Sequence, residues 1–271
     1  MKYPLIILLL FTFTVIAQSA ETKNYISGSL YYTGSTASHD RSSGAVSGYL
    51  SATIGTYHYL TAGYDNVNIE QTDWKYKQKM YIAGGGLSLY PFYIKGHFGK
   101  INGNFTGTSY EFNYKDKTNL YNLDFMLYTD YLLYRASFVL EEVTENINLT
   151  VRQYGVGAER YFGTHFYLSL IGYLSDLSDN RELYSLKTKL SYFPSTSLTL
   201  SFETFFGQRA FFFNPDLLTI YNLGPTQKNL YSLRVDYFLG GLTFVANFQY
   251  TDFEEHAARY YVAGIKYTLA Y

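Results

Sequence analysis

The residues that could carry acid–base or metal chemistry are few and widely spaced in this chain. The five histidines are His39, His58, His97, His165 and His256, and only His97 falls within a segment that we expect to form a strand. A metal site needs several ligands at a defined spacing, and these histidines have no such spacing. The absence of cysteine excludes disulfides, thiolate metal ligands and a cysteine nucleophile. We therefore predict no metal site and no cofactor.

One cluster of ionisable residues remains, in a polar link near the C-terminus. Asp252, Glu254, Glu255 and His256 lie within five positions, and carboxyl and imidazole groups can act as general acids and bases. A solvated loop tip or a weak cation site accounts for this cluster without any reaction. We expect no catalytic residue and no enzymatic activity.

The first 19 residues have the layout of a secretory signal peptide. Lys2 precedes the uncharged apolar run "PLIILLLFTFTVIA" (4–17), and Ala17 and Ser19 supply the small side chains that a signal peptidase reads. A retained anchor is the alternative, but this run is shorter than the ~20 residues that a membrane-spanning helix needs. We predict a cleaved signal peptide over 1–19 and a single mature domain over 20–271.

In the rest of the chain, apolar or aromatic residues alternate with polar ones over many short segments. The 271 residues include 32 tyrosines and 21 phenylalanines, and the formal net charge of -1 gives no reason to expect a nucleic-acid partner. In 184–192 and 230–237, apolar or aromatic residues occupy every second position and polar residues the positions between. Such segments are typical of strands with one apolar face. No helical pattern is present that could cover these faces.

About fourteen such segments are present, joined by short turns and longer polar links in alternation. A closed barrel is the only sheet without unpaired backbone edges in lipid. We therefore predict an all-β fold: an antiparallel up-and-down transmembrane β-barrel of about 14 strands, with short periplasmic turns and longer extracellular loops. Aromatic residues near the turns are expected to form a girdle at the periplasmic interface; they are Tyr90, Phe92, Tyr161, Phe162 and Phe166.

The C-terminal segment "YYVAGIKYTLAY" (260–271) carries the most specific resemblance. It alternates through Tyr267 and Leu269 and ends on the aromatic Tyr271, as barrels recognised by the outer-membrane assembly machinery do. The chain looks like a bacterial outer-membrane β-barrel and, in size, resembles the monomeric fourteen-strand porins. That resemblance implies outer-membrane lipid around the barrel, the barrel-assembly machinery as a partner during biogenesis, and small hydrophilic solutes inside.

If the apolar face meets lipid, the opposite face lines the barrel. This face carries both signs of charge, which would set the selectivity of a pore or, alternatively, pair across neighbouring strands and stabilise the wall. The charged or titratable candidates for a pore lining are Lys95, His97, Asp124, Arg135, Lys187, Lys189, Glu203, Arg234, Asp236 and Lys266.

The link "RAFFFNPDLLTIYNLGPTQ" (209–227) is unusually apolar for a segment that faces water. It is expected to fold into the barrel as a constriction, to extend the flanking strands, or to bind a partner or an apolar solute. Glycines 84–86 are expected to allow strong curvature or close packing of an inward loop.

Function is therefore predicted to be passive diffusion of small hydrophilic solutes or ions through a polar lumen. The alternative is a non-conducting barrel. Such a barrel would serve as a scaffold or partner in a cell-envelope secretion or polysaccharide-export assembly, or bind apolar ligands through the 209–227 loop.

Overall fold

The computed structural model describes residues 24–37, 41–55, 58–71, 73–107, 113–145, 148–214, 219–221, 226–254 and 256–270. The expected signal peptide (1–19) and Tyr271 lie outside these ranges. No helix within the described ranges is long and apolar enough to cross a membrane.

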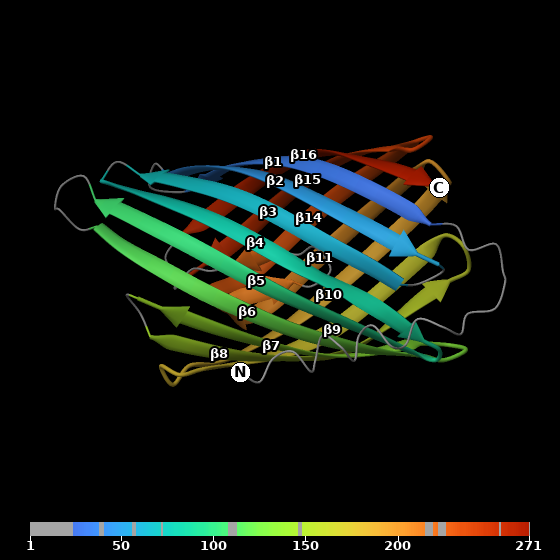
Figure 1. The fold of residues 1–271 in the computed structure, drawn as a ribbon, viewed down its shortest axis with the longest axis horizontal. Coiled ribbons are helices and arrows are strands. Elements are labelled where there is room, and N and C mark those ends of the chain that lie inside the picture. Colours follow the sequence, from blue (N-terminus) through green and yellow to red (C-terminus); the bar gives the residue numbers. More distant parts are fainter. Residues whose placement is uncertain are drawn as a thin grey trace, which may run out of the picture.

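Fourteen antiparallel strands form a closed barrel, which confirms the predicted fold class (Figure 1). Two further short strands form a separate two-stranded sheet, β12 (Phe212–Asn214) and β13 (Thr219–Tyr221). The barrel strands are β1 (Tyr25–Ala37), β2 (Arg41–Ile54), β3 (His58–Gln71), β4 (Trp74–Leu89), β5 (Phe92–Gly107), β6 (Asn113–Tyr128), β7 (Leu133–Thr144), β8 (Leu149–Phe162), β9 (Phe166–Leu177), β10 (Glu182–Ser195), β11 (Leu198–Arg209), β14 (Gln227–Leu239), β15 (Leu242–Phe253) and β16 (Ala257–Ala270).

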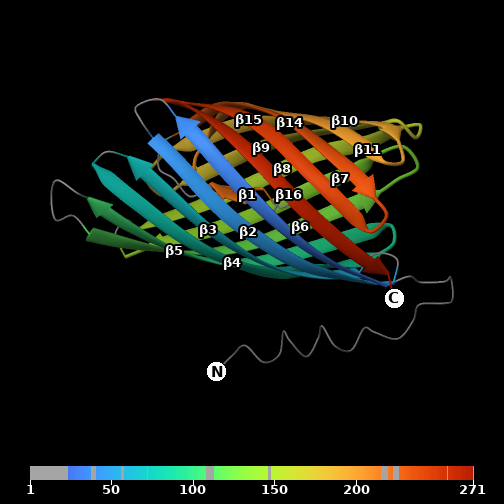
Figure 2. The same ribbon diagram turned by 90° about the horizontal axis from the view of Figure 1, so that it is seen from above.

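The wall follows the order of the chain, and each strand pairs with the next. Closure comes from β1 and β16, which pair from Tyr25↔Ala270 to Ala37↔Ala258. The order skips β12 and β13, so that β11 pairs directly with β14. The start of β1 and the end of β16 lie at the same end of the barrel as the short turns (Figure 2). We call this end of the barrel the short-turn end and the opposite end the long-loop end.

Strands reach further at the long-loop end than the polar links suggested. Within the polar stretch 102–117, for example, β5 continues to Gly107 and β6 starts at Asn113. These strand ends need no alternation of apolar and polar residues, because the strands continue to pair beyond the apolar band on the outside of the barrel. Both faces of each strand are then in polar surroundings. The connections at this end are therefore shorter than expected, apart from 209–227.

The two faces of the wall differ as the alternation requires. Leu30, Leu50 and Val156 are 61%, 64% and 67% exposed on the outer face, while the inward positions between such residues hold serine, glycine, charged and buried side chains. A broad exposed apolar exterior around a closed sheet is what a surrounding bilayer accommodates. The apolar faces therefore need no second layer of protein.

Inward-facing glycines make room for tyrosine rings on the lumen side. Gly264 on β16 is opposite Tyr31 on β1, and a Cβ added at Gly264 would lie 2.1 Å from Tyr31 Cδ1. The Tyr31 ring thus occupies the space that any other residue at 264 would fill.

Replacing Gly264 with alanine is expected to lower the free energy of unfolding by about 1–3 kcal/mol, because the added methyl group overlaps the Tyr31 ring. Urea-induced unfolding in lipid vesicles measures this change. Gly28→Ala is the matched control, since a Cβ there would meet Leu50 Cδ2 at an ordinary 3.5 Å. Equal losses for the two variants would contradict the packing of Tyr31 over Gly264.

Candidate functional site

The segment after β11 folds into the barrel. Gly207, with a φ of 99°, lies at the register shift between Phe206 and Arg209, where the chain leaves the wall. A positive φ of this size favours glycine. The side chains from Phe211 to Asn214 are all buried, and β12 pairs with β13 within this insertion (Figure 2). Of the three arrangements expected for 209–227, the described residues 209–214 and 219–221 have the inward one.

Polar contacts attach this inner hairpin, β12–β13, to the wall. The Gln153 side chain on β8 donates from Nε2 to the carbonyl oxygen of Phe213 (3.2 Å) and accepts from the Phe213 amide (3.3 Å). Lys187 on β10 donates to Asn214 Oδ1 (3.5 Å) and also pairs with Glu203 (3.5 Å). Strand β8 thus binds the backbone of β12, and strand β10 binds the side chain of its last residue.

Apolar contacts attach the hairpin over a wider area. Its three consecutive phenylalanines, 211–213, each enter a different buried cluster on the inner wall. Phe211 joins Val143, Leu149, Val151, Leu177, Leu183 and Ala210; Phe212 joins Ile171, Tyr173, Phe205 and Leu230; Phe213 joins Met80, Ile82, Ile101, Leu120 and Val139. The Arg209 guanidinium lies 3.6 Å from the centroid of Phe205 and 4.6 Å from that of Phe212.

The hairpin covers one side of the inner wall and leaves another side accessible. The inward residues of β6 to β9 nearest the hairpin, such as Val139 and Gln153, are buried. Many inward residues of β16, β1, β2 and β3 remain partly exposed instead; they include Ser29, Tyr31, Ser51, Thr61 and Lys266. Solvent therefore reaches a wall rich in hydroxyl groups beside the hairpin.

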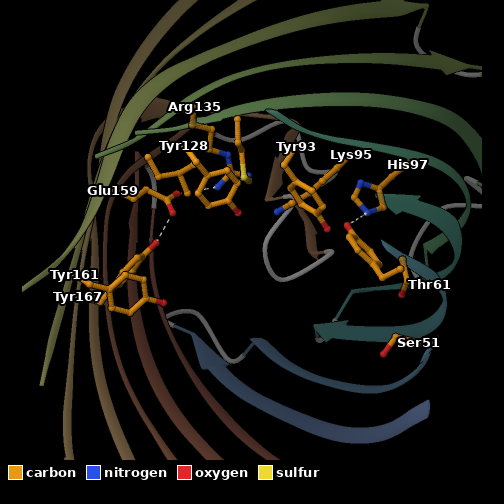
Figure 3. A pocket seen from close by; sticks show the side chains of 13 residues that line it. Ser51, Thr61, Tyr93, Lys95, His97, Tyr128, Arg135, Glu159, Tyr161 and Tyr167 are labelled. Atoms are coloured by element: carbon orange, nitrogen blue, oxygen red, sulfur yellow. Dashed lines mark hydrogen bonds and ion pairs between the residues drawn. The ribbon is translucent and has the colours of Figure 1, made fainter. Parts of the chain in front are cut away.

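A cavity of about 510 Å³ lies inside the barrel at the short-turn end. Figure 3 shows Glu159, Tyr161 and Tyr167 on one wall and Lys95 and His97 on the opposite wall. The lining comprises Ser51, Tyr59, Thr61, Tyr93, Lys95, His97, Met126, Tyr128, Leu133, Arg135, Glu159, Tyr161 and Tyr167.

A chain of charges crosses one wall of this cavity. Arg135 binds Asp124 through two hydrogen bonds, Nε to Oδ1 at 2.9 Å and Nη2 to Oδ2 at 2.5 Å, and reaches Glu159 at 3.4 Å. Lys95 Nζ lies 4.0 Å from Asp124 Oδ2, and Tyr167 donates its hydroxyl to Glu159 Oε2 at 2.7 Å. The register places these residues together, since Lys95 and Asp124 are directly opposite on β5 and β6. Two cations and two carboxylates therefore compensate each other.

A second chain of hydrogen bonds orients His97. Asn122 donates from Nδ2 to the Phe138 carbonyl (3.2 Å), so that its Oδ1 accepts from His97 Nδ1 (2.9 Å). In neutral imidazole the other nitrogen is then an acceptor, and Nε2 lies 3.4 Å from the Tyr59 hydroxyl. The His97 ring also meets the Phe213 ring, edge to face, with centroids 6.2 Å apart. His97 thus contacts both the cavity and the inner hairpin.

The glycines at 84–86 shape this cavity. A Cβ at Gly84 would lie 2.4 Å from His97 Cδ2, and one at Gly86 would lie 2.6 Å from both Tyr59 Cε1 and the Tyr93 hydroxyl oxygen. Gly84 and Gly86 thus give space to three side chains that line the cavity.

The ten pore-lining candidates all lie at inward positions of their strands. Most of them are ion-paired: beside the Lys95–Asp124–Arg135 group, Lys187 pairs with Glu203 and Arg234 with Asp236 (2.8 Å). Their role in conduction remains a prediction.

The predicted girdle and assembly residues divide between the two faces. Tyr90 is exposed at the turn before β5, and Phe92, Phe162 and Phe166 are exposed on the outer face. Tyr161 lines the cavity, because it shares the inward parity of Glu159. Tyr267 and Leu269 are exposed on the outer face of β16, while Tyr271 lies outside the described residues.

Glu141 is a feature that the sequence analysis missed. It lies inward on β7, fully buried between Val139 and Val143, and neither of its carboxylate oxygens has a hydrogen-bond partner among the described residues. Its position in the alternation marks it as inward, but nothing in the sequence indicates that its inward neighbours on β7, Val139 and Val143, belong to two different buried clusters of the insertion.

Comparisons with known proteins agree at the level of the fold. No family model and no curated protein matches the sequence. Among solved structures, a deltaS2 mutant of the TodX monoaromatic hydrocarbon channel has a TM-score of 0.61 at 10% identity, over 93% of this chain and 91% of that chain. The Pseudomonas putida toluene transporter TodX has a TM-score of 0.55 at 7% identity, over 92% and 90%.

At these identities the likeness establishes the fold alone. The closed wall and the apolar exterior agree with it. The expected fold class is therefore confirmed: the chain is a closed antiparallel β-barrel of 14 strands, similar in fold to these two solved channel structures.

Proposed function

We propose that this chain is an outer-membrane channel for small hydrophilic solutes, in which the β12–β13 hairpin controls passage. One observation carries the proposal: the hairpin lies inside a wall that is complete without it. Because Arg209 pairs with Gln227 where β11 and β14 meet, the hairpin contributes no strand to the barrel. Its position inside the lumen is better explained by control of passage than by support of the wall.

The accessible part of the lumen supports a hydrophilic solute. Hydroxyl-bearing residues such as Ser29, Ser51 and Thr61 line the side that the hairpin leaves partly exposed, and the cavity at the short-turn end continues from Ser51 and Thr61. Fixed charges set the ion selectivity of a pore. Since the inward charges are largely paired with opposite charges, we expect weak selectivity between anions and cations.

Apolar solutes form a second candidate class, favoured by the apolar clusters around the hairpin. Displacement of Phe211, Phe212 and Phe213 would expose aliphatic and aromatic surface on the inner wall. The two similar solved structures are described as a monoaromatic hydrocarbon channel and a toluene transporter, which is consistent with this class.

Single-channel recording in planar bilayers tests the proposal. The mature protein is compared with a variant in which a Gly-Ser segment of equal length replaces residues 211–224, so that the wall and the link length are kept. We expect small or rare steps from the parent and larger, ohmic, salt-dependent steps from the variant, because the hairpin no longer fills the lumen.

Two results would contradict this proposal. Silence from both proteins would remove the channel function and favour a scaffold in a cell-envelope secretion or polysaccharide-export assembly. Equal conductance from both would show that the hairpin does not restrict the lumen. A toluene-flux assay on the same pair of proteins separates the apolar class from the hydrophilic one.

A further inference from the structure

Tyrosines from five different strands converge on the cavity at the short-turn end. They are Tyr59 on β3, Tyr93 on β5, Tyr128 on β6, Tyr161 on β8 and Tyr167 on β9. Tyr59 and Tyr93 form a tilted pair with centroids 6.3 Å apart, and Tyr161 and Tyr167 form another at 4.9 Å. Tyrosine offers a flat apolar face and a hydroxyl on one side chain. The cavity therefore suits a ligand that combines a ring with polar groups.

The charges around the cavity argue against an ionic ligand. Lys95 and Arg135 face the cavity, but both pair with Asp124, and Arg135 also reaches Glu159. An anion would have to compete with two carboxylates for Arg135, and a cation would have to compete with Arg135 for the carboxylates. Breaking a buried pair of this kind is costly. A neutral ligand avoids that cost.

The hydroxyl groups on the two walls have defined orientations. Tyr167 donates its proton to Glu159, and Tyr59 is positioned to donate to His97. A tyrosine hydroxyl that donates its proton elsewhere acts as an acceptor toward other partners. The cavity thus has acceptors on opposite walls, which suit a ligand with hydroxyl donors, and Lys95 is a donor for a ligand oxygen.

The dimensions of the cavity limit the size of the ligand. Its volume of about 510 Å³ lies within the usual range for small-molecule pockets, roughly 300–1,000 Å³. Gly84 and Gly86 maintain this space, since a Cβ at either position would displace His97, Tyr59 or Tyr93. A single ring with its substituents fits such a space.

We infer that this cavity is a binding site for a small neutral six-membered ring that carries hydroxyl groups, as a phenol or a monosaccharide does. This inference rests on the proposed channel function and names the class of solute that its lumen retains. The ring stacks on one of the two tyrosine pairs, a hydroxyl group of the ring donates to Tyr59 or Tyr167, and Lys95 donates to one of its oxygens.

Calorimetric titration of the intact mature protein in detergent tests the site. The probes are phenol, glucose and, as an anionic control, benzoate. We expect saturable binding of phenol or glucose, and at least about tenfold weaker binding in the double variant Tyr59→Phe/Tyr167→Phe, which keeps both rings and removes both acceptors. Tyr154→Phe is the matched control, because Tyr154 is exposed on the outer face; it should bind as the parent does.

Several outcomes would overturn the inference: no saturable binding of either neutral probe, tighter binding of benzoate than of both, or equal affinity in the double variant and the parent. Binding of phenol alone or of glucose alone would support the site and identify the source of the ring. Calorimetry measures binding and does not require conduction. A silent bilayer recording would therefore contradict the proposed channel function, whereas the binding site would still be tested by the calorimetric result. The electrophoretic mobility of unheated samples shows whether each variant is folded.

Discussion

Replacing Phe213 with alanine is expected to turn rare channel openings into frequent ones. Phe213 is 0% exposed and packs against Met80, Ile82 and Ile101 among others, and removal of a buried phenylalanine side chain costs about 3–5 kcal/mol. If this free energy is lost only from the state in which the hairpin is attached to the wall, the equilibrium shifts at least about 100-fold toward the released state, because 1.4 kcal/mol is a factor of ten. The open probability in single-channel recordings measures the shift.

Phe202→Ala provides the matched control for this experiment. Phe202 lies on β11, the strand that leads into the insertion, but it is 47% exposed on the outer face. The same substitution there removes no contact with the hairpin and should leave the open probability unchanged. An unchanged open probability in Phe213→Ala, in a folded protein that conducts, would contradict the proposed role of the hairpin.

Replacing Arg135 with methionine is expected to cause the largest loss of stability among single substitutions in the wall. The substitution leaves Asp124 and Glu159 in the interior without their shared cation, and breaking a buried pair in this way costs about 3–5 kcal/mol. Urea-induced unfolding in lipid vesicles measures the loss. The double variant Arg135→Met/Glu159→Gln removes one cation and one carboxylate, leaves Asp124 paired with Lys95, and should recover much of it.

Arg152→Met is the matched control for Arg135→Met. Arg152 pairs with Asp176 at 3.6 Å, but its side chain is 56% exposed, and exposed pairs contribute about 0–1 kcal/mol. A loss at Arg135 no larger than that at Arg152 would mean that water reaches Asp124 and Glu159 freely. Such a result would also weaken the argument that the cavity favours neutral ligands.

The wall could be predicted from the sequence because its physics is local. Alternation with a period of two requires only that one face of each strand meets lipid and the other the lumen. That rule placed Lys187, Glu203 and Arg234 on the inner face, where the structure has them. Tyr161 differs, because its aromatic character and its position near a turn suggested the interface, whereas its parity directs it into the cavity.

The contents of the barrel could not be predicted in the same way. The three phenylalanines of 211–213 have no alternation and lie between a glycine and a proline, so their burial depends on the shape of a distant inner wall. Glu141 illustrates the same limit, because tertiary packing leaves its carboxylate without a hydrogen-bond partner in the part of the chain that the structure describes. Which charges pair across strands, as Arg135 and Glu159 do, depends on register.

Because of the inner hairpin, folding of this chain requires two kinds of step: pairing of the wall strands and attachment of the hairpin to the wall. Most wall pairs join strands that are neighbours in the sequence, and such low-contact-order pairing is fast. Attachment of the hairpin is different, since Gln153 and Phe213 are 60 residues apart, and closure joins Tyr25 to Ala270. The loop-closure entropy of folding is therefore lost mainly when these two contacts form. The inner hairpin must either be enclosed before β1 pairs with β16, or enter the lumen through an open end of the barrel after they have paired.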